Sequence, residues 1–252
     1  MRPLLTLLAI THWVLVGIII YFSLVILKMG WELVFVGFLA YLAFFVLVIV
    51  RIIRHLYRFP IPSFMTLLID NPFRRRLIQK PDVIAGRMEL GPGLIAVEIG
   101  PGKGSYTKAV AKRVLPNGKV FAVDISETVV ERLKKRVDKE CIPNIVPKIE
   151  DAYNFSFANE SVDRVFAIAC LPEIPEPVKV LKECNRILRP DGLVCLCELF
   201  IDPDFPLRDT EKRWAEEAAL VLKCEFGNCM VYQLNFGKKM AGSGSSPRDI
   251  EG

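Results

Sequence analysis

A short apolar run that stops at three closely spaced glycines sets the strongest limit on how this chain folds. Leu94–Ile99 has the length and apolar character of a buried strand, and Gly100-Pro101-Gly102-Lys103-Gly104 follows it directly. Glycine accepts backbone conformations that other residues avoid, so this turn suits an abrupt change from a strand to a helix. The residues after it, Tyr106–Val114, predict that helix.

The same alternation of strand and helix continues for about a hundred residues. Lys119–Val123, closed by Asp124, predicts the second strand, and the charged segment Glu127–Glu140 predicts the next helix. Short connections between such elements predict an α/β fold with a Rossmann-like, doubly wound, mostly parallel sheet. The carboxyl ends of its strands then share one edge, where ligands bind. Further strands are predicted at Ile145–Ile149, Arg164–Ala169 and Leu193–Leu199.

The C-terminal part of the chain departs from this alternation. Leu220–Phe226 and Met230–Phe236 flank Gly227-Asn228, which predicts a C-terminal antiparallel strand pair joined by a hairpin turn. We therefore predict one α/β domain over residues 81–240. The Gly- and Ser-rich residues 241–252 predict a disordered tail.

The first 55 residues differ from everything after them. Leu4–Leu27 and Leu33–Ile53 are apolar runs without internal charge. Each has the roughly 20 residues that a helix needs to cross a bilayer. The sequence therefore predicts two transmembrane helices that form a hairpin over residues 1–55. One alternative, a cleaved signal peptide, has a shorter apolar core and no second span directly after it. The other, a buried core hairpin, would need polar stripes on its outer faces, and none is visible.

Positive charges flank this predicted hairpin. Arg2 precedes the first run, while Arg51, Arg54 and Arg58 follow the second. The positive-inside rule then predicts an integral membrane protein with two spans and a cytosolic α/β domain. Residues 56–80 predict a basic interfacial linker against anionic lipid, or else a linker helix packed on the domain. The predicted partner is the lipid bilayer, and no nucleic acid is expected, since basic patches interleaved with aromatic residues are absent.

The cysteines do not form a metal-binding pattern. The chain has seven cysteines without CxxC pairs, and its two histidines, His12 and His55, both lie in the N-terminal region. Zinc sites require closely spaced cysteine or histidine ligands. We expect free thiols in a reducing compartment and no metal site.

Two stretches together resemble a known family. The sequence V-E-I-G-P-G-K-G at residues 97–104, followed by V-F-A-V-D at 120–124, resembles the opening of the class I S-adenosylmethionine-dependent methyltransferases. The likeness extends from about residue 72 to 239. It implies methyl transfer as the activity and S-adenosylmethionine as the cofactor.

The predicted cofactor site follows the ends of the strands. The Asp124 carboxylate can accept hydrogen bonds from both ribose hydroxyls, and the resemblance places Glu98 near the methionine end of the cofactor. It also places Asp151, with Asn154 and Phe155, near the adenine, although an ordinary loop or N-cap aspartate is the alternative for Asp151. The residues predicted to bind the cofactor are Glu98, Gly100, Pro101, Gly102, Gly104, Tyr106, Asp124, Ile125, Asp151, Ala152, Ala169 and Cys170.

Two other interpretations remain open. An NAD(P)-dependent oxidoreductase with the G-x-G-x-x-G fingerprint requires glycine at position 105, where this chain has Ser105. A non-catalytic, cofactor-binding membrane scaffold has no need of both the glycine turn and Asp124, and both are intact.

The acceptor decides whether the reaction needs a general base. Methyl transfer from a sulfonium requires alignment of acceptor and methyl group, and a base only where the acceptor must lose a proton. Glu198 is the first candidate for that base and Glu173 the second, followed by Asp202 and Tyr153. The predicted anchor favours a membrane-resident or lipophilic acceptor, namely an isoprenoid, a quinone precursor or a lipid headgroup.

Overall fold

The computed structural model describes residues 2–22, 31–45, 48, 78–200, 202 and 204–239. The chain divides into two compact units, Met1–Tyr57 and Arg58–Gly252, which we describe separately. Most of the predicted linker, residues 56–77, and the whole predicted tail, 241–252, lie outside the described residues.

Two helices that contact each other make up the described part of the N-terminal unit. They are α1, Arg2–Tyr21, and α2, Trp31–Phe44. Val16 and Val34 are buried, and His12 Nδ1 lies 3.0 Å from the hydroxyl of Tyr41. Two helices in contact agree with the helical character that the sequence predicts for these segments.

The structure does not support the two membrane spans that the sequence predicts. In α1 the polar ring of His12 lies in the middle of the helix. Among the helices that the structure describes, none combines the length and the apolarity needed to cross a membrane. The prediction of an integral membrane protein with two spans is therefore wrong, and the cytosolic placement that rested on those spans falls with it.

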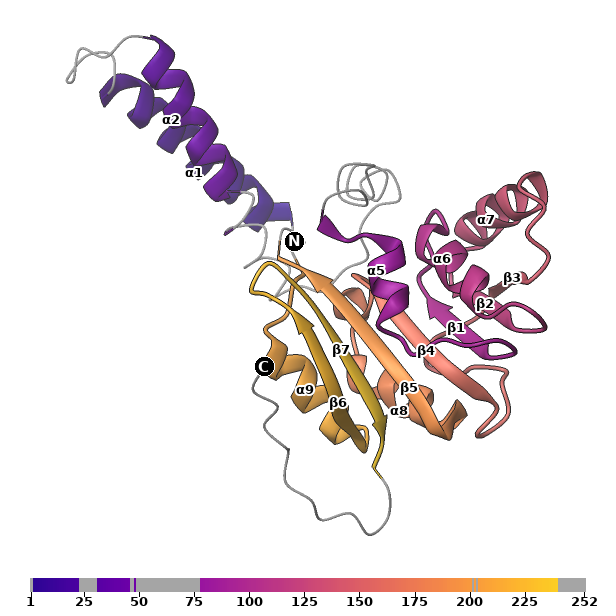
Figure 1. Ribbon diagram of the computed structural model, residues 1–252. Helices are drawn as coiled ribbons and strands as arrows, with labels where there is room; N and C mark the ends of the chain where they lie inside the picture. The colour runs from indigo at the N-terminus through magenta and orange to yellow at the C-terminus, as the bar shows by residue number, and fades with distance from the viewer. Residues whose placement is uncertain are drawn as a thin grey trace. The chain divides into compact units, whose positions relative to one another are not determined.

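The C-terminal unit is built on a seven-stranded sheet with the order β3-β2-β1-β4-β5-β7-β6 (Figure 1). The first five of these strands are parallel, and β7 runs antiparallel to both β5 and β6. The chain moves outward from β1 to β3 and then returns to β4 beside β1, which places the topological switch point between β1 and β4. The strands are β1 Ile95–Ile99, β2 Lys119–Asp124, β3 Ile145–Ile149, β4 Val162–Ile168, β5 Leu188–Leu199, β6 Leu220–Gly227 and β7 Val231–Lys238. This confirms the predicted α/β, mostly parallel sheet with a C-terminal antiparallel pair.

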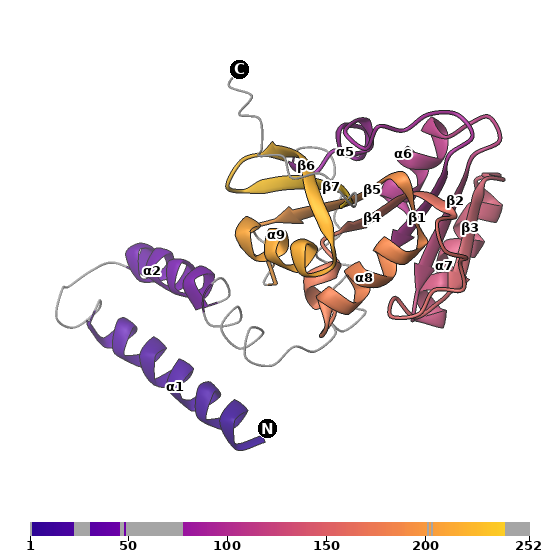
Figure 2. The same cartoon turned by 90° about the horizontal axis from the view of Figure 1, so that it is seen from below.

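Helices cover both faces of this sheet, with α5 and α6 on one side and α8 and α9 on the other (Figure 2). Ala96 belongs to the core that includes residues of α5, α6 and α7, whereas Val97 belongs to the core that includes residues of α8 and α9. Neighbouring strand residues point to opposite faces, so a strand covered on both sides needs apolar residues throughout. The helices are α5 Pro81–Gly86, α6 Ser105–Arg113, α7 Glu127–Lys139, the 3₁₀ helix η4 Leu171–Glu173, α8 Pro177–Ile187 and α9 Arg208–Glu217.

The β5 strand begins earlier than the sequence predicts. It starts at Leu188, directly after α8, and its pairing with β4 shifts register between Val162 and Arg164. An ion pair of 2.7 Å between Arg189 and Asp163 spans this irregular stretch. The other carboxylate oxygen of Asp163 accepts a hydrogen bond of 2.7 Å from the Ile95 amide, so the pair also fixes the start of β1.

Polar side chains in the sheet attach α5 and the turn that follows it. Asn235 donates to the carbonyl oxygen of Arg87 at 2.6 Å, and Arg164 donates to that of Met88 at 2.7 Å. Carbonyl groups at a helix C-terminus have no partner within the helix. These side chains satisfy such groups and hold α5 against the sheet.

Candidate functional site

The predicted site residues gather at the carboxyl ends of the parallel strands. Glu98 lies near the end of β1, Asp124 ends β2, and Glu198 lies near the end of β5. Ala169 directly follows β4, and its amide donates to the Cys197 carbonyl at 2.9 Å. In open α/β sheets, ligands bind outside this edge at the switch point.

The glycine loop after β1 adopts a conformation that favours glycine at three positions. Gly100, Gly102 and Gly104 have φ angles of +69°, +51° and +75°. A Cβ atom on Gly100 would collide with the side chain of Cys170, whereas one on Gly102 would have no neighbour within 4 Å. The backbone at Gly100 is therefore packed against the protein. The backbone at Gly102 has free space beside it, so a ligand can approach it there. This geometry fits the cradle that a nucleoside cofactor needs.

The carboxylate of Glu98 is held by a residue that sequence reasoning missed. Glu98 is 1% exposed, and the Thr107 hydroxyl donates a short hydrogen bond to its Oε2. Thr107 lies in the first turn of α6, directly after the glycine loop. Its position so close to that loop was the sequence signal that could have identified it. The neighbouring Tyr106, predicted to bind the cofactor, donates its hydroxyl to the Gln79 carbonyl at 3.2 Å.

Asp124 presents an oriented carboxylate at the end of β2. The Ser126 amide donates to Asp124 Oδ1 at 2.8 Å, and none of the described residues donates a hydrogen bond to Oδ2. Burial raises the pKa of Asp124 and outweighs the bond from Ser126, which lowers it. Ile125, next in the chain, is 75% exposed. An oriented acceptor beside an exposed apolar side chain suits a ribose and the base attached to it.

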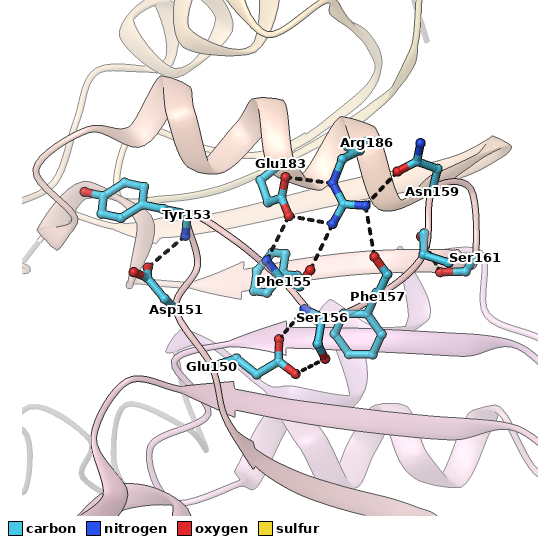
Figure 3. A network of polar contacts seen from close by, with 11 residues as sticks. Glu150, Asp151, Tyr153, Phe155, Ser156, Phe157, Asn159, Ser161, Glu183 and Arg186 are labelled. Carbon is cyan, nitrogen blue, oxygen red and sulfur yellow. Dashed lines mark hydrogen bonds and ion pairs between the residues drawn. The ribbon is translucent and has the colours of Figure 1, made fainter.

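The loop between β3 and β4 carries the predicted adenine-binding residues (Figure 3). Asp151 is exposed, and its Oδ1 accepts a hydrogen bond of 2.9 Å from the Tyr153 amide. Ala152 is half-buried and Asn154 is exposed. The Phe155 ring is buried in the core shared with α8 and α9, so the structure does not bring it to the surface of this loop.

Carboxylates from four elements act electrostatically on the thiol of Cys170. Burial raises the pKa of this thiol well above its ordinary value, and the negative charges of Glu173, Asp124, Glu198 and Glu98 raise it further. The thiol therefore stays protonated at neutral pH. The same carboxylates make this part of the edge electronegative, which favours a cationic ligand such as a sulfonium.

The candidate bases lie on the β4 and β5 side of this edge. Glu173 lies in η4, and its carboxylate oxygen lies within 4.8 Å of oxygens of Asp202 and Asp204. Glu198 is buried and pairs across the ladder with Tyr232 of β7. Sequence reasoning missed Asp204, although the spacing Asp202-x-Asp204 after a strand was a visible signal. Tyr153, another candidate, uses its hydroxyl to accept a hydrogen bond of 3.1 Å from the Glu176 amide.

Comparison with known proteins finds similarity to methyltransferases. Residues 97–196 match the family model described as "Methyltransferase domain". Demethylmenaquinone methyltransferase of Geobacillus stearothermophilus is 33% identical over 125 residues, which cover 49% of this chain and 53% of that protein. The catalytic subunit of a tRNA (adenine(58)-N(1))-methyltransferase of Yarrowia lipolytica is 28% identical over 51% of this chain and 33% of its own length. The chain thus spans about half or less of these relatives.

The fold agrees with this match. A SAM-dependent methyltransferase from Aquifex aeolicus superimposes with a TM-score of 0.65, covering 70% of this chain and 98% of that chain at 19% identity. The predicted class I fold is confirmed, and the match to a methyltransferase domain supports S-adenosylmethionine as the cofactor. An NAD(P)-dependent oxidoreductase is not favoured.

Proposed function

We propose that this S-adenosylmethionine-dependent methyltransferase methylates a ring carbon of a lipophilic quinone precursor. The class of enzyme follows from the methyltransferase domain and its fold. The acceptor is inferred from two sources, the carboxylates on the β4 and β5 side of the site and the sequence similarity to demethylmenaquinone methyltransferases.

The residues around the switch point fit the cofactor. The open backbone at Gly102 and the oriented carboxylate of Asp124 suit the nucleoside, with Asp151 on the adenine side and Glu98 toward the methionine group. When bound, S-adenosylmethionine supplies an electrophilic methyl group on a sulfonium. The electronegative surroundings of Cys170 suit that positive charge.

The carboxylates beyond Cys170 supply what a phenolic acceptor needs. A ring carbon becomes a strong nucleophile when the hydroxyl group beside it loses its proton. Glu173 is half-buried beside Asp202 and Asp204, so in this proposal its carboxylate takes that proton. The ring carbon takes the methyl group while its bond to sulfur breaks, and the ring proton then leaves to solvent, which restores the aromatic ring as a phenolate. Glu173 returns its proton to that oxygen, which gives the methylated hydroquinone and leaves the carboxylate ionised for the next turnover. Glu198 is 1% exposed, so we assign it to positioning and no longer to proton transfer.

The observation that carries the proposal is the convergence of Glu173, Asp202 and Asp204 next to the electronegative switch point. It is tested by incubating the full chain with methyl-labelled S-adenosylmethionine and reduced demethylmenaquinone, with phosphatidylethanolamine vesicles in parallel. We expect label in the quinone ring, detected by mass spectrometry, and a loss of about 100-fold in kcat for Glu173→Gln, as for removal of a general base.

Two outcomes would change the proposal. Label in the vesicle lipid alone would replace the quinone acceptor with an amine and leave the enzyme class intact. Saturable binding of S-adenosylmethionine without transfer to either acceptor would reject both acceptors.

A further inference from the structure

We infer that Glu183 and Arg186 of α8 are positioning residues, which hold the β3–β4 loop so that Asp151 can bind the adenosine part of the cofactor. The inference rests on the proposed cofactor site. Neither residue belongs to the set predicted to touch the cofactor. Their role follows from the bonds that they make to the loop (Figure 3).

Arg186 binds this loop at three points. Its Nη1 donates to the Phe157 carbonyl at 2.9 Å and to Asn159 Oδ1 at 2.7 Å. Its Nη2 donates to the Phe155 carbonyl at 3.0 Å. A guanidinium presents several donors in a fixed planar geometry, which an ammonium group cannot reproduce. One side chain of α8 therefore fixes the path of the loop over several residues.

Glu183 completes the arrangement from the same face of α8. Its Oε2 accepts a bond of 2.9 Å from Arg186 Nε, and its Oε1 accepts one of 2.6 Å from Nη2. The same Oε1 accepts a bond of 2.8 Å from the Phe155 amide. Both peptide groups of Phe155 are thereby bound to α8, its N–H by Glu183 and its C=O by Arg186. The bond from Arg186 lowers the pKa of Glu183, so the carboxylate stays ionised at neutral pH.

Local hydrogen bonds connect Asp151 to the part of the loop that α8 holds. The Asn154 amide donates to the Asp151 carbonyl at 3.0 Å, and the Tyr153 amide donates to Asp151 Oδ1 at 2.9 Å. The base of the loop is closed by Glu150, whose Oε2 accepts a bond of 2.8 Å from the Ser156 amide. The loop is therefore a small hydrogen-bonded turn attached to α8 at Phe155. Its position relative to the end of β3 depends on that attachment.

The chain contains a matched control for this role. Arg189 forms an ion pair of 2.7 Å with Asp163, close to the 2.6 Å of Arg186 with Glu183. The two arginine side chains are 44% and 33% exposed. Arg189 makes no hydrogen bond to the β3–β4 loop among the described contacts. Replacing either arginine with lysine perturbs the same helix–strand junction, but only one replacement releases the loop.

The test compares Arg186→Lys with Arg189→Lys in the full chain by calorimetric titration of S-adenosylmethionine and of methylthioadenosine, which lacks the amino-acid group. For Arg186→Lys we expect both dissociation constants to rise by the same factor, about tenfold, with kcat unchanged at saturating cofactor. For Arg189→Lys we expect both constants to stay within about twofold of wild type. Glu183→Gln, which keeps an oxygen acceptor, should shift both constants in the same direction by a smaller factor.

The outcomes separate this inference from the proposed function. Equal loss of thermal stability in both lysine variants, with unchanged dissociation constants, would show that the pair is only structural. A fall in kcat with an unchanged KM for the cofactor would also overturn the inference. If Arg186→Lys fails to fold, Glu183→Gln decides by the same criteria. Failure of the wild-type chain to bind S-adenosylmethionine would instead reject the proposed cofactor site.

Discussion

The loops after β1 and β3 lie at the same edge of the sheet, but different interactions hold them. The glycine loop, residues 100–104, depends on backbone conformation, with positive φ at each of its three glycines. The β3–β4 loop, residues 150–161, has no glycine and depends on side chains, chiefly Glu150, Glu183 and Arg186. The glycine loop should lose its conformation when an atom is added to a glycine, and the β3–β4 loop should lose its conformation when a hydrogen-bonding group is removed.

Adding one carbon atom to the glycine loop should have the largest effect. Gly100→Ala places a Cβ against Cys170 at a φ of +69°, where a side chain costs about 1–2 kcal/mol in addition to the collision. We expect S-adenosylmethionine to bind at least about 30-fold more weakly, measured by calorimetric titration. Gly100→Ala combined with Cys170→Ala should recover part of the affinity, because the collision with Sγ is removed while a close contact of 3.1 Å with Cβ and the backbone strain remain. Wild-type affinity in Gly100→Ala would show that backbone conformation does not control this loop.

Asp124, at the end of β2, offers a second comparison because it is a single acceptor and not a loop. Asp124→Ala should weaken cofactor binding about tenfold, as expected for loss of charge-assisted hydrogen bonds. Burial raises the pKa of Asp124 above the ordinary aspartate value of 3.8. On acidification, the affinity of the wild-type chain for the cofactor should therefore begin to fall at a higher pH than it would with an ordinary aspartate. Asp124→Asn should bind more weakly at neutral pH but show no such acid-dependent loss. A pH dependence that persists in Asp124→Asn would assign the titration to another group.

Acid should loosen the β3–β4 loop and leave the glycine loop in place. Burial raises the pKa of Glu150, but hydrogen bonds from Lys148 and Ser156 outweigh it, so its pKa lies below 4.5, as does that of Glu183. Such groups contribute stability above about pH 4.5, and this contribution is lost as pH falls through the lowered values. As pH falls, the Ser156 amide should therefore lose its protection against hydrogen exchange, measured relative to the intrinsic rate at each pH, before the Gly104 amide does. Simultaneous loss of protection would mean that both loops open only with global unfolding.

Removing a single hydroxyl from the β3–β4 loop should have the smallest effect. Ser156→Ala deletes the bond of 2.5 Å from Ser156 Oγ to Glu150 and the bond of 2.8 Å from Lys148 Nζ to Ser156 Oγ, but it keeps the backbone amide bond to Glu150. An exposed bond of this kind contributes about 0.5–1 kcal/mol. We expect a slightly lower melting temperature in calorimetry and a cofactor affinity within about twofold of wild type. A loss as large as that of Arg186→Lys would indicate that Glu150, and not α8, positions the loop.

Sequence reasoning predicted the parts of the site that local patterns encode. The strand ending at Ile99, the glycines after it and the aspartate ending β2 were all visible, because each depends on neighbouring residues. Element boundaries were harder to predict than element type. The fifth strand was expected to begin at Leu193, whereas β5 begins at Leu188. Alternation indicates which segments are strands, but the start of a strand depends on pairing contacts that the local pattern does not contain.

The sequence by itself determined the order of elements, the glycine loop and the acidic residues at the strand ends, since backbone preference and side-chain alternation act over a few residues. Only the tertiary structure decided which distant side chains meet. It brought Thr107 to Glu98, Arg186 to the loop after β3, and the carboxylate of Asp204 to Glu173. These meetings depend on strand order and helix packing, which join segments far apart in the chain and leave no local pattern.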